Sequence, residues 1–527
     1  MRTLLRQMQA TGWLRWQSQS GRGKRGDLQF LRAPESLRQQ MMEEALNSGQ
    51  PHDALAIAQL APEDLRVLLN PFLGGLWQND TPTLRIPYYR PLERLHPGFL
   101  PGRAEQHLAG QVFSGLTRYV NNSVLPQGDL AHHWDISEDQ LCWRFHIRPT
   151  LHWHNGDAVD TRQLQQRFML LLELPALRTL FASVNSVEVT HSHCLTFRLH
   201  HPDFWLAHRL ASYACLLAHP QMPDSGTGPF KLVSFSKELV RLESHEHYHL
   251  NHPFIKAVEF WITPLLFAQN LGTSCRHPVQ IAIGEPDELS QLKTVSNSTS
   301  LGFCYLALRA DASLNPAQSR RLVQIIHQTT LLHTLPLDED LIAPSEALIP
   351  GWDIPRWLQQ ETVPLPPALT LVYHLPVELH TMAQQLKRYL ATLGCALTVI
   401  FHDAKTWEGC DMLAQADLMM GDRLIGEAPE YALAQWLRCD PLWPNVLSTR
   451  QFAHLQATLD AVQCQADEQA RVSALQGVFT RLMDDAILTP LFNYQYRISA
   501  PPGVEGIQLN TRGWFDFAEA WLPPPIR

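Results

Sequence analysis

The chain opens with a helical pattern of apolar residues that changes, within a few positions, into the alternation of a β-strand. Leu4, Leu5 and Met8 are spaced to form an apolar face on a helix. Gly12 follows as a residue that can end this helix in the left-handed conformation. Residues 13–17 then alternate between apolar and polar side chains, and a second short apolar run comes after a glycine-rich turn. The pattern predicts a short helix followed by a β-hairpin.

From residue 34 onward the pattern changes twice. Residues 34–80 have the pattern of several short helices divided by glycine and proline, which predicts a polar helical connector. From Thr83, strand-like runs such as 83–89 alternate with helical stripes such as 103–116. This alternation is typical of an α/β body, and a chain of 527 residues is too long for a single core.

Positive charge is concentrated at the start of a chain whose formal net charge is −9. Residues 1–32 hold a single acid, Asp27, against seven basic residues. These basic residues are Arg2, Arg6, Arg15, Arg22, Lys24, Arg25 and Arg32. A helix followed by a hairpin with a basic tip is the second half of a winged helix-turn-helix, so we predict a partial domain of this kind over residues 1–33.

We predict that this segment contacts DNA through the exposed face of its helix and through the tip of its hairpin. The predicted contact residues are Arg2, Thr3, Arg6 and Gln7 on the helix, and Arg22, Lys24 and Arg25 in the turn. The alternative is a basic loop that is only solvated, because charge attracts phosphate without reading sequence. A helix-turn-helix also needs a supporting helix before the recognition helix. None precedes Met1 in this sequence, so we expect a start assigned too late or a truncated form.

The composition of the chain restricts the cellular compartment in which the protein is expected. No run approaches 18 apolar residues, so no membrane span and no membrane partner are expected. The N-terminus lacks the apolar core of a secretory signal. The nine cysteines are scattered and never form a CxxC pair, which favours free thiols in a reducing compartment. We therefore predict a cytoplasmic protein.

Sequence motifs for catalysis are missing. The chain contains no GxSxG, HExxH or GxxxxGK[ST] segment, so we predict neither an enzyme nor a cofactor. His245, His247 and His249 alternate and would share one face of a strand, with His252 shortly after, which allows metal chelation in principle. No set of carboxylates and cysteines nearby completes such a site, so we predict no metal.

Several motifs in the body occur in a characteristic order. They are Phe113, Gly115 and Leu116; Ala131 and Trp134; Phe145, Arg148, Trp153, His154 and Gly156; GTGPF at 226–230; and Tyr248. In this order they resemble the family 5 extracellular solute-binding proteins, which serve ABC importers of peptides and nickel. The resemblance implies a two-lobed α/β body of the type II periplasmic-binding-protein class. It implies a first lobe over 82–265, a second lobe over 266–488, and a return to the first lobe over 489–527.

Taken together, the basic segment and the body resemble a narrower group, the SgrR/YbaE family of transcriptional regulators. The shared motifs are MRTLL, GRGKRG, YYRPL at 88–92, FSGLTR at 113–118 and GWFDF at 513–517. Two further segments, 151–159 and 418–431, resemble the YbaE branch of that family. In this family a winged helix is fused to a solute-binding domain, so the resemblance implies DNA at a promoter operator as a partner.

The implied fold places a small solute in a cleft between the lobes. We predict that the cleft is lined by Tyr88, Tyr89, Arg90, Thr117, Trp134, Arg423 and Trp514. For each there is a structural alternative: Trp134 fits a lobe core, and Arg423 fits an ordinary salt bridge.

The predicted function is a ligand-responsive, DNA-binding transcriptional regulator that senses a sugar phosphate or a peptide. The alternatives are the solute-binding protein of an ABC peptide importer, which would need export, and a paralogue that has lost DNA binding.

Overall fold

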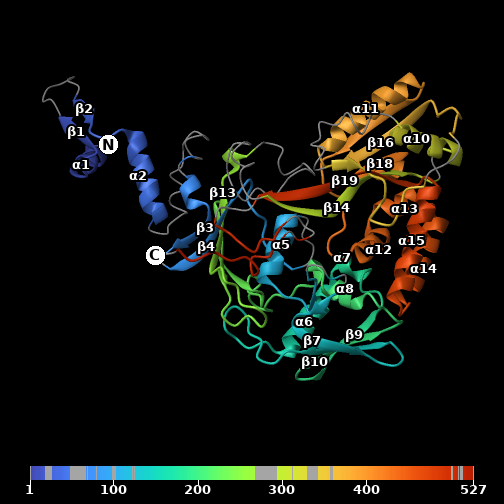
Figure 1. The fold of residues 1–527 in the computed structure, drawn as a ribbon, viewed down its shortest axis with the longest axis horizontal. Coiled ribbons are helices and arrows are strands. Elements are labelled where there is room, and N and C mark those ends of the chain that lie inside the picture. Colours follow the sequence, from blue (N-terminus) through green and yellow to red (C-terminus); the bar gives the residue numbers. More distant parts are fainter. Residues whose placement is uncertain are drawn as a thin grey trace.

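The structure is a computed structural model. It describes residues 2–17, 26–47, 67, 69–78, 80–97, 102–120, 123, 125–267, 294–310, 313–328, 342–355, 360–499, 503–508, 510 and 514–525. Figure 1 shows the N-terminal elements at one end of the long axis and two α/β lobes toward the other end. The fold class predicted from the sequence, a two-lobed α/β body preceded by a small helix-hairpin and a connector, is confirmed.

The N-terminal segment is a helix and a two-stranded antiparallel sheet, as predicted. Helix α1 (Arg2–Ala10) is followed by β1 (Leu14–Gln17) and β2 (Asp27–Phe30), with Leu14 opposite Phe30. Gly12 has a φ of +74°, and its neighbour Trp13 donates its backbone N–H to the Met8 carbonyl, which ends the helix. Leu14 is buried.

The apolar face of α1 is narrower than the sequence suggested. Leu5 and Met8 are half-buried, whereas 62% of Leu4 is exposed. Adjacent residues of a helix lie about 100° apart around its axis, so Leu4 cannot share the buried side with Leu5.

The connector packs on the first lobe. It contains α2 (Pro34–Asn47) and the short 3-10 helix η1 (Asn70–Phe72) within the described ranges. Met42 and Leu46 of α2 form a buried apolar cluster with Leu239 and Trp261, which belong to the lobe. This cluster attaches the helix that follows the hairpin to the body.

The first lobe contains two main sheets and the two-stranded pair β5-β6. The larger has the order β11-β12-β13-β4-β3, and β4 runs parallel to β13. Its strands are β3 (Gly74–Gln78), β4 (Thr81–Tyr88), β11 (Phe230–Phe235), β12 (Leu239–Ser244) and β13 (Ala257–Ile262). Helix α5 (Arg103–Val112) and the C-terminal residues around Trp514 and Leu522 pack with this sheet in one core. Strand β3 lies inside the range predicted as connector, yet it pairs with β4 as part of the lobe.

The smaller sheet has the order β7-β8-β10-β9 and is antiparallel. Its strands are β7 (Ala131–Ile136), β8 (Cys142–Ile147), β9 (Val184–His191) and β10 (Cys194–Leu199). Helix α6 (Thr161–Glu173) buries Leu164 and Phe168 against Phe145 and Phe197 of these strands. The remaining elements are β5 (Thr117–Arg118), β6 (Gln127–Gly128), α7 (Pro175–Arg178), α8 (Leu206–Leu210), η2 (Tyr213–Cys215) and η3 (Pro264–Leu266).

The second lobe is built on a mixed sheet of order β15-β19-β14-β18-β16-β17. Its strands are β14 (Thr294–Leu308), β15 (Ile342–Pro344), β16 (Ala368–His374), β17 (Ala396–His402), β18 (Leu418–Leu424) and β19 (Leu488–Ser499). The long strands β14 and β19 extend from this lobe toward the first one (Figure 1).

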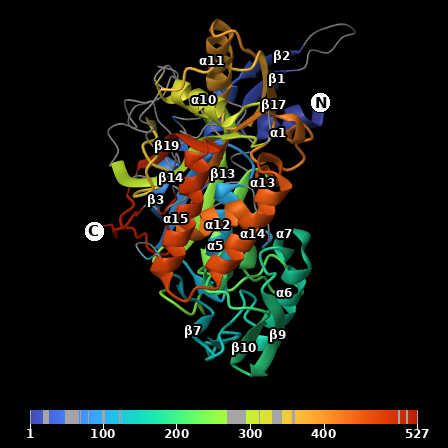
Figure 2. The same cartoon turned by 90° about the vertical axis from the view of Figure 1, so that its right-hand side faces the viewer.

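Helices cover both faces of this sheet. Helices α10 (Pro316–Gln328) and α11 (Glu378–Thr392) share one core with it. A second core holds the helices α12 (Pro429–Cys439), α13 (Leu442–Val446), α14 (Thr449–Gln463) and α15 (Glu468–Asp484), which Figure 2 shows grouped together, and the 3-10 turn η5 (Leu413–Gln415). Within the described ranges, no helix combines the length and the apolar character needed to cross a membrane.

Candidate ligand cluster and DNA-contacting segment

The two lobes contact each other through aromatic side chains near α8. Trp205 of the first lobe is buried within the second lobe's core, with its ring 6.1 Å from that of Tyr431. The Tyr431 ring also lies 5.9 Å from the imidazole of His208. The backbone N–H of Phe204 donates to the carbonyl of Gln463 at 2.9 Å. These contacts join the two lobes through residues 204–208 of the first lobe.

A cluster of charged and aromatic side chains lies at the end of β4 in the first lobe. Both terminal nitrogens of Arg90 donate to the carboxylate of Glu105 on α5, at 2.7 and 2.8 Å. The guanidinium lies 5.9 Å from the ring centre of Tyr88 and 5.7 Å from that of Tyr89, within cation–π range. Burial opposes the charge of Glu105, but the hydrogen bonds and the charge of Arg90 outweigh it and lower the pKa of the carboxyl.

A cation of the second lobe faces this group. Although part of the Lys405 side chain is exposed, its crowded surroundings remove water from the amine, and this lowers its pKa. Tyr89, Arg90, Arg103 and Asp422 all act electrostatically on the same amine, and the two arginines lower its pKa further. Lys405 and Arg90 therefore act on each other electrostatically although the two belong to different lobes. We call the set Tyr88, Tyr89, Arg90, Arg103, Glu105, Lys405 and Asp422 the interlobe cluster.

The structure brings three of the predicted ligand residues, Tyr88, Tyr89 and Arg90, into this cluster. Arg423 follows Asp422 on β18, and its Nη2 donates to the carbonyl of Ala432 at 3.4 Å. Ligand contact by these four residues stays a prediction.

Trp514 and Trp134 are placed in packing positions. Trp514 is buried, stacks on His107 with ring centres 5.0 Å apart, and lies 6.1 Å from Tyr88. It thus supports the Tyr88 ring from the core side. Trp134 is half-buried on β7, 6.0 Å from the Phe145 ring of the small sheet's core.

Thr117 is buried, and its hydroxyl donates to the carbonyl of Ala207 at 2.7 Å. That bond joins β5 to α8. Ligand contact by Thr117, Trp134 and Trp514 likewise stays a prediction.

Sequence reasoning missed four members of the cluster, namely Arg103, Glu105, Lys405 and Asp422. Glu105 lies on the buried side of α5, and its side chain is only 1% exposed. An acid at a buried position of a helix is a signal that could have pointed to it. Nothing local marks Lys405, because its proximity to Arg90 arises only when the lobes assemble.

Three of the four side chains predicted on α1 to contact DNA lie on its outer surface. Thr3, Arg6 and Gln7 are exposed, and Arg2 begins the helix. The predicted contacts in the hairpin turn, Arg22, Lys24 and Arg25, lie outside the described residues. The described part of the segment thus presents one row of polar side chains on a small helix.

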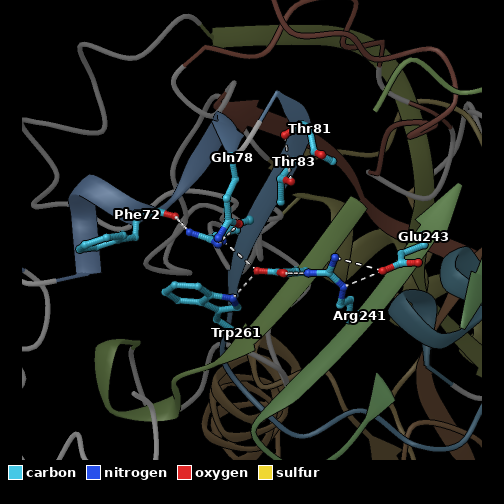
Figure 3. A network of polar contacts seen from close by, with 9 residues as sticks. Phe72, Gln78, Thr81, Thr83, Arg241, Glu243 and Trp261 are labelled. Carbon is cyan, nitrogen blue, oxygen red and sulfur yellow. Dashed lines mark hydrogen bonds and ion pairs between the residues drawn. The ribbon is translucent and has the colours of Figure 1, made fainter. Parts of the chain in front are cut away.

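A buried polar network joins the connector to the first-lobe sheet (Figure 3). Arg85 of β4 donates from Nε to Glu259 at 2.8 Å, from Nη2 to the Gln78 side chain at 2.7 Å, and from Nη1 to the Phe72 carbonyl at 3.5 Å. Its guanidinium lies 4.9 Å from the ring centre of Trp261. Phe72 belongs to the connector and Trp261 packs against α2, so one buried arginine contacts both sides of this junction.

The carboxylate of Glu259 is the centre of this network. It accepts hydrogen bonds from Arg85, from Arg241 and, at 3.1 Å, from the indole N–H of Trp261. Arg241 also donates to Glu243, at 3.0 Å. Figure 3 shows Phe72 and Gln78 on one side of the network and Arg241 and Glu243 on the other. None of these residues was singled out from the sequence.

Comparison with known proteins identifies both parts of the chain. Residues 1–80 match the family described as "Sugar transport-related sRNA regulator N-term". Residues 126–269 match "Bacterial extracellular solute-binding proteins, family 5 Middle".

Two relatives are similar over the whole chain. The protein YbaE of Escherichia coli (strain K12) is 65% identical over 525 residues, covering 100% of this chain and 93% of that protein. The HTH-type transcriptional regulator SgrR of Yersinia pestis (strain Pestoides F) is 29% identical over 540 residues, with the same coverage of each.

Solved structures share the fold of the body. NikA from Brucella suis, in complex with Fe(III)-EDTA, has a TM-score of 0.70 at 16% identity and covers 84% of this chain and 100% of its own. A dipeptide binding protein from Pseudoalteromonas sp. SM9913, in complex with Met-Leu, has a TM-score of 0.64 at 14% identity, covering 83% of this chain and 100% of its own. Together with the identity to YbaE, these matches confirm the family expected from the sequence: the chain belongs to the SgrR/YbaE family, in which an SgrR-type N-terminal segment precedes a family 5 solute-binding body.

Proposed function

We propose that this protein is a transcriptional regulator whose solute-binding body senses a small solute and whose N-terminal segment binds DNA. One observation carries the proposal: a basic helix-hairpin is attached, through a connector packed on the first lobe, to a body with the fold of solute-binding proteins. The similarity to SgrR regulators over the full chain supports the same function.

The interlobe cluster supports a solute with an anionic group, which a sugar phosphate and a peptide both carry. Arg90 is neutralised by Glu105, while Lys405 lies near Arg90 and Arg103 with Asp422 as its acidic neighbour. An anion between the lobes would relieve the repulsion between Lys405 and the two arginines, and would therefore stabilise the closed arrangement. A ligand shifts such an equilibrium only by its differential affinity for the two states. Couplings of this kind are typically about 1–3 kcal/mol.

Closure reaches the DNA-binding segment through the connector. The Arg85 network and the cluster of Met42, Leu46 and Trp261 hold the connector to the large sheet of the first lobe. The same sheet contains β4, which ends at the interlobe cluster. A change in the position of β4 would therefore be passed to the helix-hairpin.

We place this function in the cytoplasm. The eight cysteines that fall within the described ranges are free thiols, as a reducing compartment would keep them. The alternative, a solute-binding protein of an ABC importer, draws on the fold shared with the dipeptide binding protein. Fractionation of cells separates the two, because an importer's receptor must leave the cytoplasm.

The test is DNA binding by fluorescence anisotropy on fragments selected from genomic DNA. We expect sequence-specific binding that weakens in Arg6→Ala, with the slope of log K against log salt reduced by about 0.9 for one lost phosphate contact. Arg162→Ala is the matched control, because Arg162 is an equally exposed arginine on α6 and should leave binding unchanged. Absence of DNA binding at low salt, or equal loss in both variants, would contradict the proposal.

A further inference from the structure

A hollow of about 670 Å³ lies at the junction of the two sheets of the first lobe. One wall comes from β7 and the loop after β8, both belonging to the small sheet. The other wall is the turn between β12 and β13 of the large sheet. Five histidines and one arginine dominate the lining: His132, Arg148, His152, His247, His249 and His252.

Neighbouring histidines in the same two segments show what a purely structural role looks like. His154 accepts a hydrogen bond from the backbone N–H of Gly226 at 3.1 Å and donates from Nε2 to the Gly228 carbonyl at 3.0 Å. Its two ring nitrogens are therefore both used, and burial lowers its pKa to about 3. His245 also contacts the Gly228 carbonyl, at 3.3 Å, and burial lowers its pKa to about 4. These two imidazoles stay neutral and hold the turn.

The histidines of the hollow are placed differently. His152 contacts the carbonyl of Thr150 through Nδ1 at 2.9 Å, which puts the proton of the neutral ring on Nδ1. Its Nε2 then carries a lone pair until the ring takes a second proton. The ring of His247 lies 5.0 Å away, and its side chain is exposed. When both rings are protonated they repel each other, unless a negative charge lies beside them.

The acidic residues at the hollow are too few to neutralise its arginine and its histidines when these are protonated. His249 binds the carboxylate of Asp129 through Nε2 at 2.7 Å, so that acid is already paired. Arg148 donates from Nε to the Asp129 carbonyl at 2.7 Å, which fixes the plane of its guanidinium at the edge of the hollow. Glu246 is the one acid among the residues that line the hollow.

The charged groups behind the hollow are mixed. Tyr248 lies close to Asp129, Arg118 and Asp516, and burial raises the pKa of the Asp516 carboxyl. Lys231 lies close to His154. The residues that line the hollow include five histidines and Arg148.

We propose that this hollow is a second solute site, for a small polyvalent oxyanion, and that protonation of His152 and His247 strengthens binding. The ligand class is a molecule with two or more carboxylate or phosphoryl groups, held by Arg148 and the imidazolium groups. Among the described residues, no group of three or more His, Cys, Asp or Glu side chains is arranged to hold a metal ion, so the geometry favours an anion over a cation.

The pH dependence follows from linkage. An anion beside an imidazole favours its protonated form, so binding takes up a proton and becomes tighter as the pH falls. Affinity therefore increases from pH 7.8 to pH 5.8.

The test is isothermal titration calorimetry of the full chain with pyrophosphate and with citrate. We expect at least tenfold tighter binding at pH 5.8 than at pH 7.8. The pair of probes separates phosphoryl from carboxylate recognition. The double variant His152→Gln/His247→Gln should lose at least tenfold in affinity at pH 5.8. If the double variant folds poorly, the single variant His247→Gln takes its place, because it alters only an exposed side chain. It should lose less affinity than expected for the double variant.

The matched control is His191→Gln/His193→Gln. These two exposed histidines have ring centres 6.2 Å apart on the same lobe and do not line the hollow. Their replacement should leave affinity unchanged. The proposal is overturned if neither anion binds, if binding is independent of pH, or if the control loses as much as the test variant. Zinc binding that strengthens at pH 7.8 and is lost in the double variant, without anion binding, would overturn it in favour of a metal site.

Discussion

Arg85 lies within β4 and Arg90 two residues beyond its end, and each binds a buried glutamate, yet they belong to two different kinds of site. Arg85 is 2% exposed, and all three of its side-chain nitrogens have partners within a network that also includes Arg241 and Trp261. The Arg90 side chain is 29% exposed, and a cation from the other lobe lies close to it. A closed and balanced network fixes the structure, whereas a half-open cluster with a facing cation leaves room for a solute.

The comparison assigns a separate task to each arginine. Arg85 holds the connector and therefore maintains the attachment of the N-terminal helix-hairpin, the segment proposed to bind DNA. Arg90 orders the interlobe cluster and therefore the proposed ligand site. Changes at Arg85 should therefore affect mainly the free energy of unfolding. Changes around Arg90 should lower solute affinity more than they lower stability.

The largest effect is expected for Arg85→Ala. It removes one of the two arginines that pair with the buried carboxylate of Glu259 and leaves Arg241 as its charged partner, and breaking a buried pair costs up to about 3–5 kcal/mol. Urea unfolding measures the loss in free energy of unfolding. The double variant Arg85→Met/Glu259→Gln also removes the buried negative charge that has lost one of its two arginines, and it should recover part of the loss. An Arg85→Ala protein as stable as the parent would show that the network is not structural.

A smaller loss is expected for Glu105→Gln. Arg90 loses its charged partner, but water reaches its half-open side chain, so the cost is about 1–3 kcal/mol, typical of charge-assisted hydrogen bonds. Because the folded-state pKa of Glu105 is lowered, its stabilisation is present above the unfolded pKa near 4.3 and is lost as the pH falls through the folded value. Thermal unfolding from pH 6 to pH 3 should therefore show a shallower loss of stability in the variant. Identical slopes in parent and variant would contradict the assigned pair.

The smallest effect on stability is expected for Lys405→Gln. The amine is partly exposed, so unfolding free energy should change by less than about 0.5 kcal/mol, as for ordinary surface substitutions. Solute affinity should fall about tenfold, equivalent to about 1.4 kcal/mol. A thermal-shift screen with hexose phosphates and dipeptides provides the solute, and titration of that solute gives the affinity. Lys387→Gln, on the solvent side of α11, is the control. Unchanged affinity in Lys405→Gln would show that Lys405 is not part of the proposed solute site.

Much of the fold could be predicted because its signals are local. The helix and hairpin follow from the spacing of Leu5 and Met8, from Gly12 and from the alternation that follows. The α/β body follows from strand and helix periodicities and from ordered motifs. The ends of elements were less predictable: β3 lies within the segment expected to be helical connector, because pairing with β4 outweighs local preference.

The candidate site could be predicted only in part. Tyr88, Tyr89 and Arg90 could be proposed together because they lie at the end of an evident strand. Lys405 and Asp422 were missed because their positions depend on how the second lobe meets the first. The hollow was missed for a related reason: His152 and His247 are 95 positions apart, and only the packing of two sheets brings their rings within 5.0 Å.

The sequence by itself determined the class of this protein, because a basic helix-hairpin and the motifs of a solute-binding body are both written in short, contiguous segments. The tertiary structure decided which charged side chains are paired and which are exposed to a solute. Arg85 and Arg90, like His154 and His152, are chemically the same residues in neighbouring positions. What separates them is the set of partners that distant parts of the chain bring to each nitrogen, and the water that the packing removes or leaves.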